Sequence, residues 1–485
     1  MRRDTPIFGG IVIVAVVVSL FTGVTASHRT RNAAGTAPVV ARTLVCPVVN
    51  GSPRHTTGVA TVSDVGAALP TPTHGTGTIT ATVLDGPKAK TTTLKVRPWA
   101  TVHSRDLQPA SVAINVEGTI AASVVADQMI ETTSGRYRAL AGGACLPPAT
   151  DWWFAGGNGK LGFTNRLVLA NAGSTDASVA VTAWTPKGEV QNPRLASIRV
   201  PAHSRVPVGI FKVAPDIPTV AMHVHADSGA VTASVIDRRS HGVDSNGGDL
   251  VPPTLPPDRH LVIPGFPATA GPRSLVVVNP GDSDASVAVK VATPNGQFTP
   301  SSLRDFVVGA GRTATVDVTK ALGGQSGAVM LTSDVPVFAS GQASLVPGNR
   351  RLRPDFVWLA ATNPLTSPAA VAIGREPEGG DCVLILTAPG DRAGSVRLTT
   401  PGGRSRTIDV EAGHTVQAYV TDTVKSPNSP WSFVVTSTGD GPVHAVRTLL
   451  LHGAHGALLT TEPLTSLPLP IALPQVRQEP RLAVR

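Results

Sequence analysis

Residues 170–188 read ANAGSTDASVAVTAWTPKG, and residues 278–296 read VNPGDSDASVAVKVATPNG. The second phrase follows the first at an offset of 108 positions, the distance from Thr175 to Ser283. In each phrase a run rich in Val and Ala lies between two turn sequences that contain Gly, Pro, Asn or Asp. Alternate residues of a β-strand share one face, and these turn residues reverse the chain. The phrase therefore predicts a turn, a strand and a second turn, used twice.

The similarity continues outside the quoted phrase and divides the chain into modules. LVLAN at 167–171 matches LVVVN at 275–279, and fainter copies begin with CVLILTAPGD at 382–391 and include EGTIAASVVAD at 117–127. Four β-modules are predicted, with a leader before them and a Pro-rich tail after them. Their predicted bounds are 1–27 for the leader, 40–148, 149–255, 256–354 and 355–465 for the modules, and 466–485 for the tail.

The period-two pattern predicts the fold class. Within the first phrase, Val179, Val181 and Ala183 would share one strand face, and Trp184 would lie on the other. A module of about 100 residues with six or seven such strands is typical of an antiparallel β-sandwich of the immunoglobulin or fibronectin kind. A β-propeller with half-module blades is the alternative, but the repeat has the length of a whole module. We therefore expect an all-β chain of tandem sandwiches, strung one after another behind an N-terminal hydrophobic helix.

The composition agrees with a β protein and argues against a nucleic-acid partner. Gly occurs 48 times and Pro 43 times without a fixed period, which is typical of many short strands joined by turns. The formal net charge is +9, but the Lys and Arg residues are spread along the chain. Nucleic-acid-binding proteins gather these residues into a patch or stripe, so no nucleic-acid partner is expected.

The N-terminus predicts export. Arg2 and Arg3 precede an apolar stretch over 7–26, which at about 20 residues is long enough to span a bilayer and also suits the core of a signal peptide. The leader is therefore a signal peptide or a membrane anchor. In either case, the remainder of the chain is expected outside the cytoplasm.

The chain contains three cysteines. Cys46 and Cys145 bracket the first module and could form a disulfide in an oxidising compartment. Cys382 lies near the start of a predicted strand and is interpreted as a buried apolar residue. Without CxxC spacing, a zinc site built on cysteines is not expected.

Catalytic signatures are missing from the sequence: it contains no GxSxG, no HExxH and no P-loop. His223 and His225 would share a strand face, a spacing found in some metal sites, but the sequence offers no evident third ligand. The carboxylates of the segment 237–249 are spaced faintly like a calcium loop, and we interpret that segment as a flexible linker between modules. No catalytic residue, metal or cofactor is therefore assigned.

Trp152 and Trp153 are the candidate ligand-binding residues. Adjacent strand residues face opposite ways, so one ring would fill a core while the other could stack on a sugar. The alternative is that both rings fill the interface between the first and second modules. Trp358, at the corresponding start of the fourth module, favours the structural role.

The leader, WWFAGG at 152–157, the NPGD turn at 279–282, and VGAGRT (308–313) with VEAGHT (410–415) resemble a family of actinobacterial envelope proteins of unknown function. The resemblance covers most of the chain. It implies an exported or membrane-anchored protein built of tandem β-modules, and it transfers no catalytic residue.

The expected function is that of a non-catalytic, exported cell-envelope protein that acts as a scaffold or interaction module. Its partner would be an envelope protein or polysaccharide, and the N-terminal segment would contact the membrane. The alternative is a carbohydrate-binding accessory protein in the assembly of envelope polysaccharide. An enzyme would require a cluster of acidic or histidine residues in a deep pocket, which the sequence does not reveal.

Overall fold

The computed structural model describes part of the chain, namely residues 36–47, 54–61, 76–94, 111–242, 244–349, 351–373, 380–400, 404–420 and 431–472. The predicted leader at 1–27 lies outside these residues, as does the predicted tail beyond residue 472. Over the described ranges, none of the helices has the length and apolar character needed to cross a bilayer.

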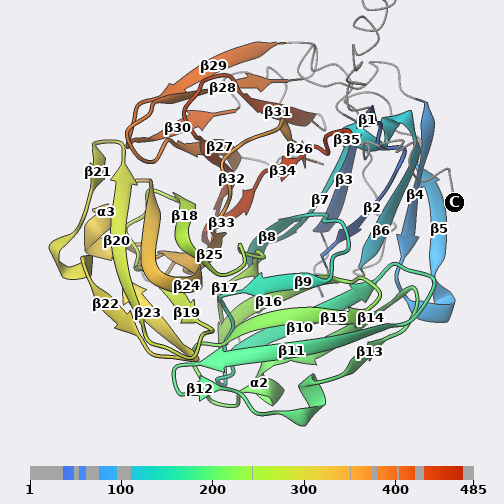
Figure 1. Cartoon of the computed structure of the whole chain (residues 1–485), viewed down its shortest axis with the longest axis horizontal. Helices are drawn as coiled ribbons and strands as arrows, with labels where there is room; N and C mark the ends of the chain where they lie inside the picture. Colours follow the sequence, from blue (N-terminus) through green and yellow to red (C-terminus); the bar gives the residue numbers. More distant parts are fainter. Residues whose placement is uncertain are drawn as a thin grey trace, which may run out of the picture. The chain divides into compact units, whose positions relative to one another are not determined.

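Two compact units are present. The smaller comprises Met1–Pro38 and Pro470–Arg485, and in it β1 (Thr36–Ala37) pairs with β35 (Ile471–Ala472). The larger unit, Val39–Leu469, contains the remaining strands in antiparallel sheets. All-β architecture is thus confirmed for the described residues (Figure 1).

The first set of strands forms two sheets. They are β2 (Ala41–Cys46), β6 (Val112–Gly118), β4 (Gly77–Val83) and β5 (Lys90–Leu94) in one, and β3 (Arg54–Thr61), β7 (Val124–Thr132) and β8 (Ala139–Ala144) in the other.

The second set also forms two sheets. One sheet contains β12 (Gly188–Glu189), β11 (Ala177–Thr185), β15 (Ala221–Ser228) and β9 (Asp151–Phe154), with β13 (Ile198–Val200) beside β11. The other contains β14 (Ser204–Gly209), β10 (Phe163–Asn171), β16 (Thr232–His241) and β17 (Asp244–Val251).

In the third set, one long strand joins both sheets. This strand, β24 (Gly327–Leu345), pairs through its first half with β18 (Asp258–Phe266) and β20 (Ala285–Thr293), and through its second half with β19 (Arg273–Asn279) and β25 (Asp355–Ala360). The shorter neighbours are β21 (Gly296–Phe298), β22 (Phe306–Val308) and β23 (Arg312–Asp317).

The fourth set returns to two separate sheets. One sheet contains β29 (Ser405–Val410), β28 (Gly394–Thr399), β31 (Trp431–Ser437), β26 (Ala369–Ile373) and β34 (Thr465–Ser466). The other contains β30 (Thr415–Tyr419), β27 (Gly380–Thr387), β32 (His444–Gly453) and β33 (Gly456–Pro463). The described helical segments of the chain are short: η2 (Gly86–Lys88), η3 (Thr119–Ser123), η4 (Pro193–Leu195), α2 (Ile210–Val213), η5 (Ser301–Leu303) and α3 (Thr319–Leu322).

The repeated phrase has the same structure in both copies. It forms β11 in the first copy and β20 in the second, and in both strands the residues at alternate positions are buried, as the period-two pattern predicts. Before each strand, an asparagine closes the turn: Asn171 donates from Nδ2 to the carbonyl of Val200 at 3.0 Å, and Asn279 donates to that of Val308 at 3.0 Å. Each asparagine Oδ1 also accepts from the backbone N–H two residues later, at 2.8 and 3.0 Å. The phrase therefore recurs because one turn chemistry serves both modules.

The third set extends further than its predicted bounds. Strand β25 begins at residue 355, where the sequence placed the fourth module, but it pairs with β24 along residues 340–345. All six of its residues are buried. Trp358 therefore lies in the last strand of the third set, in the place that β17 takes in the second set and β8 in the first.

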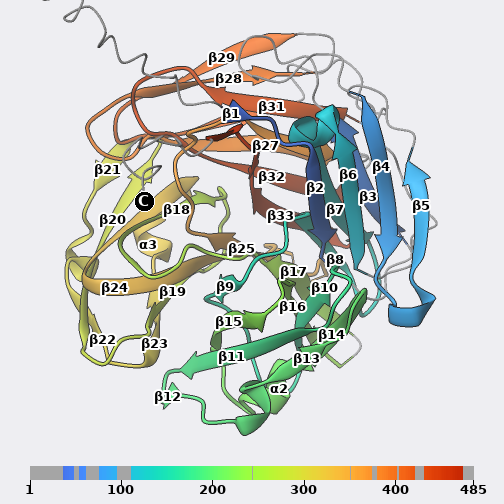
Figure 2. The same cartoon turned by 45° about the vertical axis from the view of Figure 1, so that its right-hand side comes forward.

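The sets of strands pack in a closed cycle within the larger unit. Strand β8 packs on β17, β17 on β25, β25 on β33, and β33 on β8, and both Figure 1 and Figure 2 show these strands beside one another. Strand β26 of the fourth set also packs on β3 and β7 of the first. The expectation of modules strung one after another is therefore wrong, because the first and last sets are in contact.

The segment 237–249 is also different from its sequence interpretation. It forms the end of β16 and most of β17, which pair as a hairpin, so it is not a linker between modules. Asp237 and Asp249 are 0% and 2% exposed. Their carboxyl groups make contacts in the closed packing, and the faint calcium-like spacing comes from these structural carboxyls.

Candidate functional sites

The two predicted binding tryptophans lie on opposite faces of β9. Trp152 is buried in the core of the second set, where its Nε1–H donates to the carbonyl of Val231 at 2.9 Å. Trp153 is half-buried on the other face and lies edge-on to Phe338 of β24, with ring centroids 5.0 Å apart. The alternation was predicted, but Trp153 faces the third set rather than an interface with the first.

Trp153 is enclosed by further rings. Its indole stacks on the imidazole of His223, with centroids 3.7 Å apart and planes 9° from parallel. Trp184, which is 4% exposed, lies in a nearly parallel plane at 6.2 Å from Trp153. A sugar-binding platform needs an uncovered ring face, and His223 already covers one face of Trp153.

Two histidines and an aspartate meet beside this aromatic stack. His223 and His225 alternate along β15 and so share a face, while Asp151 of β9 is the register partner of His225. Asp151 Oδ1 lies 2.9 Å from His223 Nε2 and 2.8 Å from His225 Nδ1. No sequence pattern indicated this cluster, because Asp151 is 72 positions before His223 and shares no motif with it.

The three groups influence one another's protonation. Hydrogen bonding from His225, assisted by Thr150 and His223, lowers the pKa of Asp151 to about 2 despite some desolvation. The hydrogen bond with Asp151 raises the pKa of His225 above its usual value. Burial lowers the pKa of His223, and Asp151 opposes that shift. Asp151 is therefore a carboxylate at neutral pH.

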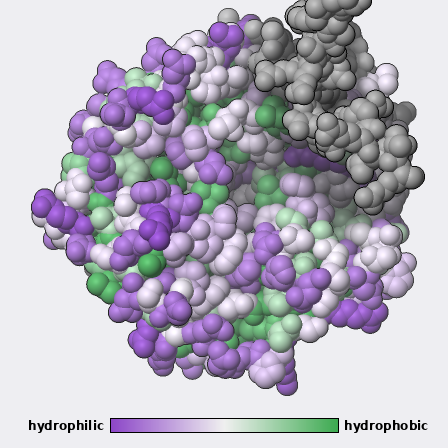
Figure 3. Space-filling model, viewed as in Figure 1, coloured by the Kyte–Doolittle hydropathy of each residue, from purple (hydrophilic) through white to green (hydrophobic). Residues whose placement is uncertain are grey.

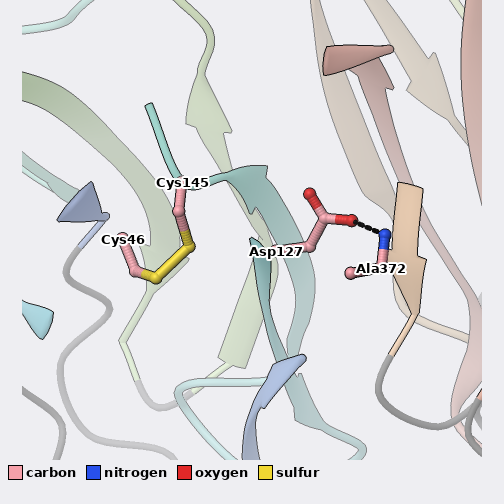
Figure 4. The surroundings of a disulfide bond; sticks show 4 residues. All are labelled: Cys46, Asp127, Cys145 and Ala372. Carbon is pink, nitrogen blue, oxygen red and sulfur yellow. Dashed lines mark hydrogen bonds between the residues drawn. A yellow bond between two sulfur atoms is a disulfide. The ribbon is translucent and has the colours of Figure 1, made fainter. Parts of the chain in front are cut away.

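Cys46 and Cys145 are joined by a disulfide, which Figure 4 shows at the end of β2. Both residues are fully buried in the core of the first set. Next to them, Val45 and Leu146 exchange two backbone hydrogen bonds, at 2.7 and 3.1 Å. The bond therefore ties β2 to the chain that leaves β8. Cys382 is buried in β27, as predicted.

Buried polar groups connect the sets where they pack in their cycle. The Nε1–H of Trp358 donates to Asp237 Oδ2 at 2.9 Å, and its backbone N–H donates to Asp249 Oδ2 at 2.9 Å. Asp249 Oδ1 also bonds with the hydroxyl of Thr460 in β33, at 2.9 Å. One tryptophan and two aspartates thus connect the second, third and fourth sets.

The contacts continue to the first set. Arg138, which is 2% exposed, donates from Nη2 to the carbonyls of Gly456 and Ala457 at 2.8 and 2.9 Å. Asp127 of β7 accepts from the backbone N–H of Ala372 in β26 at 2.6 Å, as Figure 4 shows. Each buried polar group that is left unpaired costs about 1–3 kcal/mol, so these bonds hold the cycle in one arrangement.

Asp355 gives this closed packing a pH dependence. Burial raises its pKa to about 7, against the hydrogen bond that it accepts from the backbone N–H of Leu459. The pKa of this group is 3.8 in the unfolded chain, so between pH 3.8 and about pH 7 the folded state binds one more proton than the unfolded state. The free energy of unfolding therefore falls as the pH rises through this range. His444 opposes this trend only below 6.5, because burial lowers its pKa to about 4.

We therefore expect the free energy of unfolding to fall between pH 6.5 and about pH 8, by about 1 kcal/mol on account of Asp355. Asp355→Asn cannot release a proton, so its unfolding free energy should fall less over the same interval. Urea unfolding at the two pH values measures the difference. Equal slopes for wild type and variant would show that Asp355 is already ionised when folded.

A pocket of about 310 Å³ opens where the first, second and fourth sets meet, and we call it the junction pocket. Its wall is largely apolar and includes Pro47, Leu250 and Pro463. Two buried hydroxyl oxygens on this wall, Thr232 Oγ1 and Thr465 Oγ1, have no hydrogen-bond partner among the described residues. An apolar wall with a few polar groups is typical of ligand-binding pockets, and the volume is at the lower end of their range. No sequence pattern indicated this pocket, because its walls come from three different sets.

A model of a family of unknown function, DUF5719, matches residues 100–421 of the chain. That range covers the second and third sets and parts of the first and fourth. A comparison with curated proteins finds none that matches.

Proposed function

We propose that this chain, which belongs to the family of unknown function DUF5719, is a non-catalytic interaction protein of the cell envelope. In this proposal the closed cycle of β-modules is a rigid body, and the junction pocket receives an apolar group of a partner protein. The observation that carries the proposal is the pocket itself, with an apolar wall contributed by three sets of strands.

Three features support a location outside the cytoplasm. The disulfide between Cys46 and Cys145 is a kind of bond that persists in oxidising compartments. The apolar stretch that follows Arg2 and Arg3 in the sequence is typical of an exported or membrane-anchored protein. The resemblance to actinobacterial envelope proteins supports the same location.

The apolar wall of the junction pocket and the covered faces of the tryptophans favour a protein partner over a polysaccharide. Polysaccharide recognition depends on uncovered aromatic faces, whereas Trp152 is buried and Trp153 is stacked on His223. On the face seen in Figure 3, hydrophobic residues form small groups between hydrophilic ones. An apolar partner group would therefore find only small contact areas on that face.

The test fills the pocket with a larger side chain. Ser234 is a half-buried residue of the pocket wall, and Ser234→Phe would occupy space that the partner needs. We expect the full chain to bind solubilised envelope proteins saturably, and Ser234→Phe to bind them about ten-fold more weakly or worse, a loss of about 1.4 kcal/mol or more. Ser178→Phe, on the half-exposed side of β11 and outside the pocket, is the matched control and should bind like wild type.

The same experiment includes isolated wall polymer as a second binding partner. Binding to the polymer that survives Ser234→Phe and disappears in Trp153→Ala would replace the proposal with the carbohydrate-binding alternative. Absence of saturable binding to either fraction would refute both.

A further inference from the structure

Asp151, His223 and His225 combine donor atoms of the kind that hold transition metals. Their ligand atoms all lie within 4.8 Å of one another. In the part of the chain that the structure describes, no other cluster joins three or more such residues in this way. His452 and Asp381 form a simpler pair 3.6 Å apart, without a third member. The Asp151 cluster is thus distinguished from an ordinary surface pair by its number of donors.

The spacing is close to that of a metal-bound set. Ligands of a tetrahedral zinc ion, at bonds of about 2.0–2.2 Å, are about 3.3–3.6 Å apart. Asp151 Oδ1 lies 2.9 Å and 2.8 Å from the two histidine nitrogens. Admission of the ion would require these two distances to lengthen by about half an ångström. The two histidine nitrogens, which lie within 4.8 Å of each other, would also have to take up the tetrahedral spacing. Asp151 and His225 are both exposed, so their side chains have the freedom to move this far.

The surroundings orient the donors as metal sites require. The hydroxyl of Thr150 donates to Asp151 Oδ2 at 2.8 Å, which leaves Oδ1 facing the histidines. Stacking on Trp153 fixes the plane of the His223 ring. Supporting contacts of this kind orient metal ligands and increase affinity. The ladder of β9, β15 and β11 holds the backbone of the three donors in register.

One side of the cluster remains open to solvent. The side chains of Asp151 and His225 are 45% and 48% exposed, and that of His223 is 19% exposed. Two imidazole nitrogens and one carboxylate suit zinc and the other first-row divalent ions, and sites with three protein ligands leave a coordination position for water or another molecule.

We propose that Asp151, His223 and His225 bind one divalent transition-metal ion, with Zn²⁺ as the reference ion and one coordination position facing solvent. This site is separate from the junction pocket, so it stands or falls independently of the proposed function.

The test is a titration of the full chain, first freed of metal with a chelator, with Zn²⁺ in a calorimeter. We expect one ion per chain in the wild type. Asp151→Asn and His225→Gln should each lower the affinity at least ten-fold, because each removes one of three ligands. His452→Gln removes a histidine from the two-member pair and is the matched control, with unchanged affinity.

Both test positions are exposed, so the variants should fold, and circular dichroism spectra check this. Zn²⁺ should also raise the melting temperature of wild type and of His452→Gln, but not of the two site variants. The proposal is overturned if the wild type shows no saturable binding, or if the site variants bind Zn²⁺ as tightly as the control.

Discussion

Replacement of both Cys46 and Cys145 by alanine is expected to lower the free energy of unfolding by about 2–5 kcal/mol. The two cysteines are 99 positions apart, so the disulfide closes a long loop in the unfolded chain. Closure of a loop of this length removes about 4.7 kcal/mol worth of unfolded-state entropy in the chain-entropy account. Because both residues are buried in the core of the first set, we expect the first set of strands in the double variant to unfold at a lower denaturant concentration than the other sets.

Denaturant unfolding followed by circular dichroism measures the effect. Added reductant should lower the unfolding midpoint of the wild type and leave that of the double variant unchanged, which makes the variant its own control for nonspecific effects of the reductant. If wild type and double variant unfold at the same denaturant concentration, the disulfide contributes nothing to stability.

The second large effect is expected at the ion pair between Arg447 and Glu462. The two residues are register partners on β32 and β33, and their side chains are 2% and 6% exposed. Removal of one member of a buried pair leaves the other charge without compensation and costs about 3–5 kcal/mol. Arg447→Met should therefore destabilise the protein by about that amount.

Asp127 should add to the effect of Arg447→Met. Burial raises the pKa of this carboxyl to about 6, and the charge of Arg447 works against that rise. Without Arg447, the pKa of Asp127 should rise further. The free energy of unfolding would then fall with rising pH over a wider range, up to the higher pKa of Asp127.

A double-mutant comparison separates the cost of an unpaired charge from the loss of packing. Arg447→Met combined with Glu462→Leu should recover the part of the stability that the unpaired charge of Glu462 costs, because apolar pairs often replace buried ion pairs at little cost. Arg199 provides the control: its pair with Asp176 is exposed, and Arg199→Met should leave the unfolding free energy close to that of the wild type. Additive losses in the double variant would contradict the ion-pair account.

The sequence was sufficient for those parts of the structure that arise locally. Alternation along residues 177–185 and 285–293 predicted which residues of β11 and β20 are buried, except for Trp184 and Ala292, which lie on the other face and are buried as well. This succeeded because the pleat of a strand sends neighbouring side chains to opposite faces whatever surrounds it. The turns were equally readable, since Asn171 and Asn279 bond to backbone groups close to them in the chain.

Only the tertiary structure decided which modules pack against one another and which polar groups form hydrogen bonds between them. Trp358 contacts Asp237 across 121 positions, and Asp127 contacts Ala372 across 245. No periodic pattern or turn signal connects residues so far apart, so the sequence showed Asp237 and Asp249 only as part of a polar segment. Asp151 was likewise an unremarked residue before two tryptophans until strand pairing placed it between His223 and His225. Local steric rules determine the strands, whereas the packing of distant surfaces determines both candidate sites.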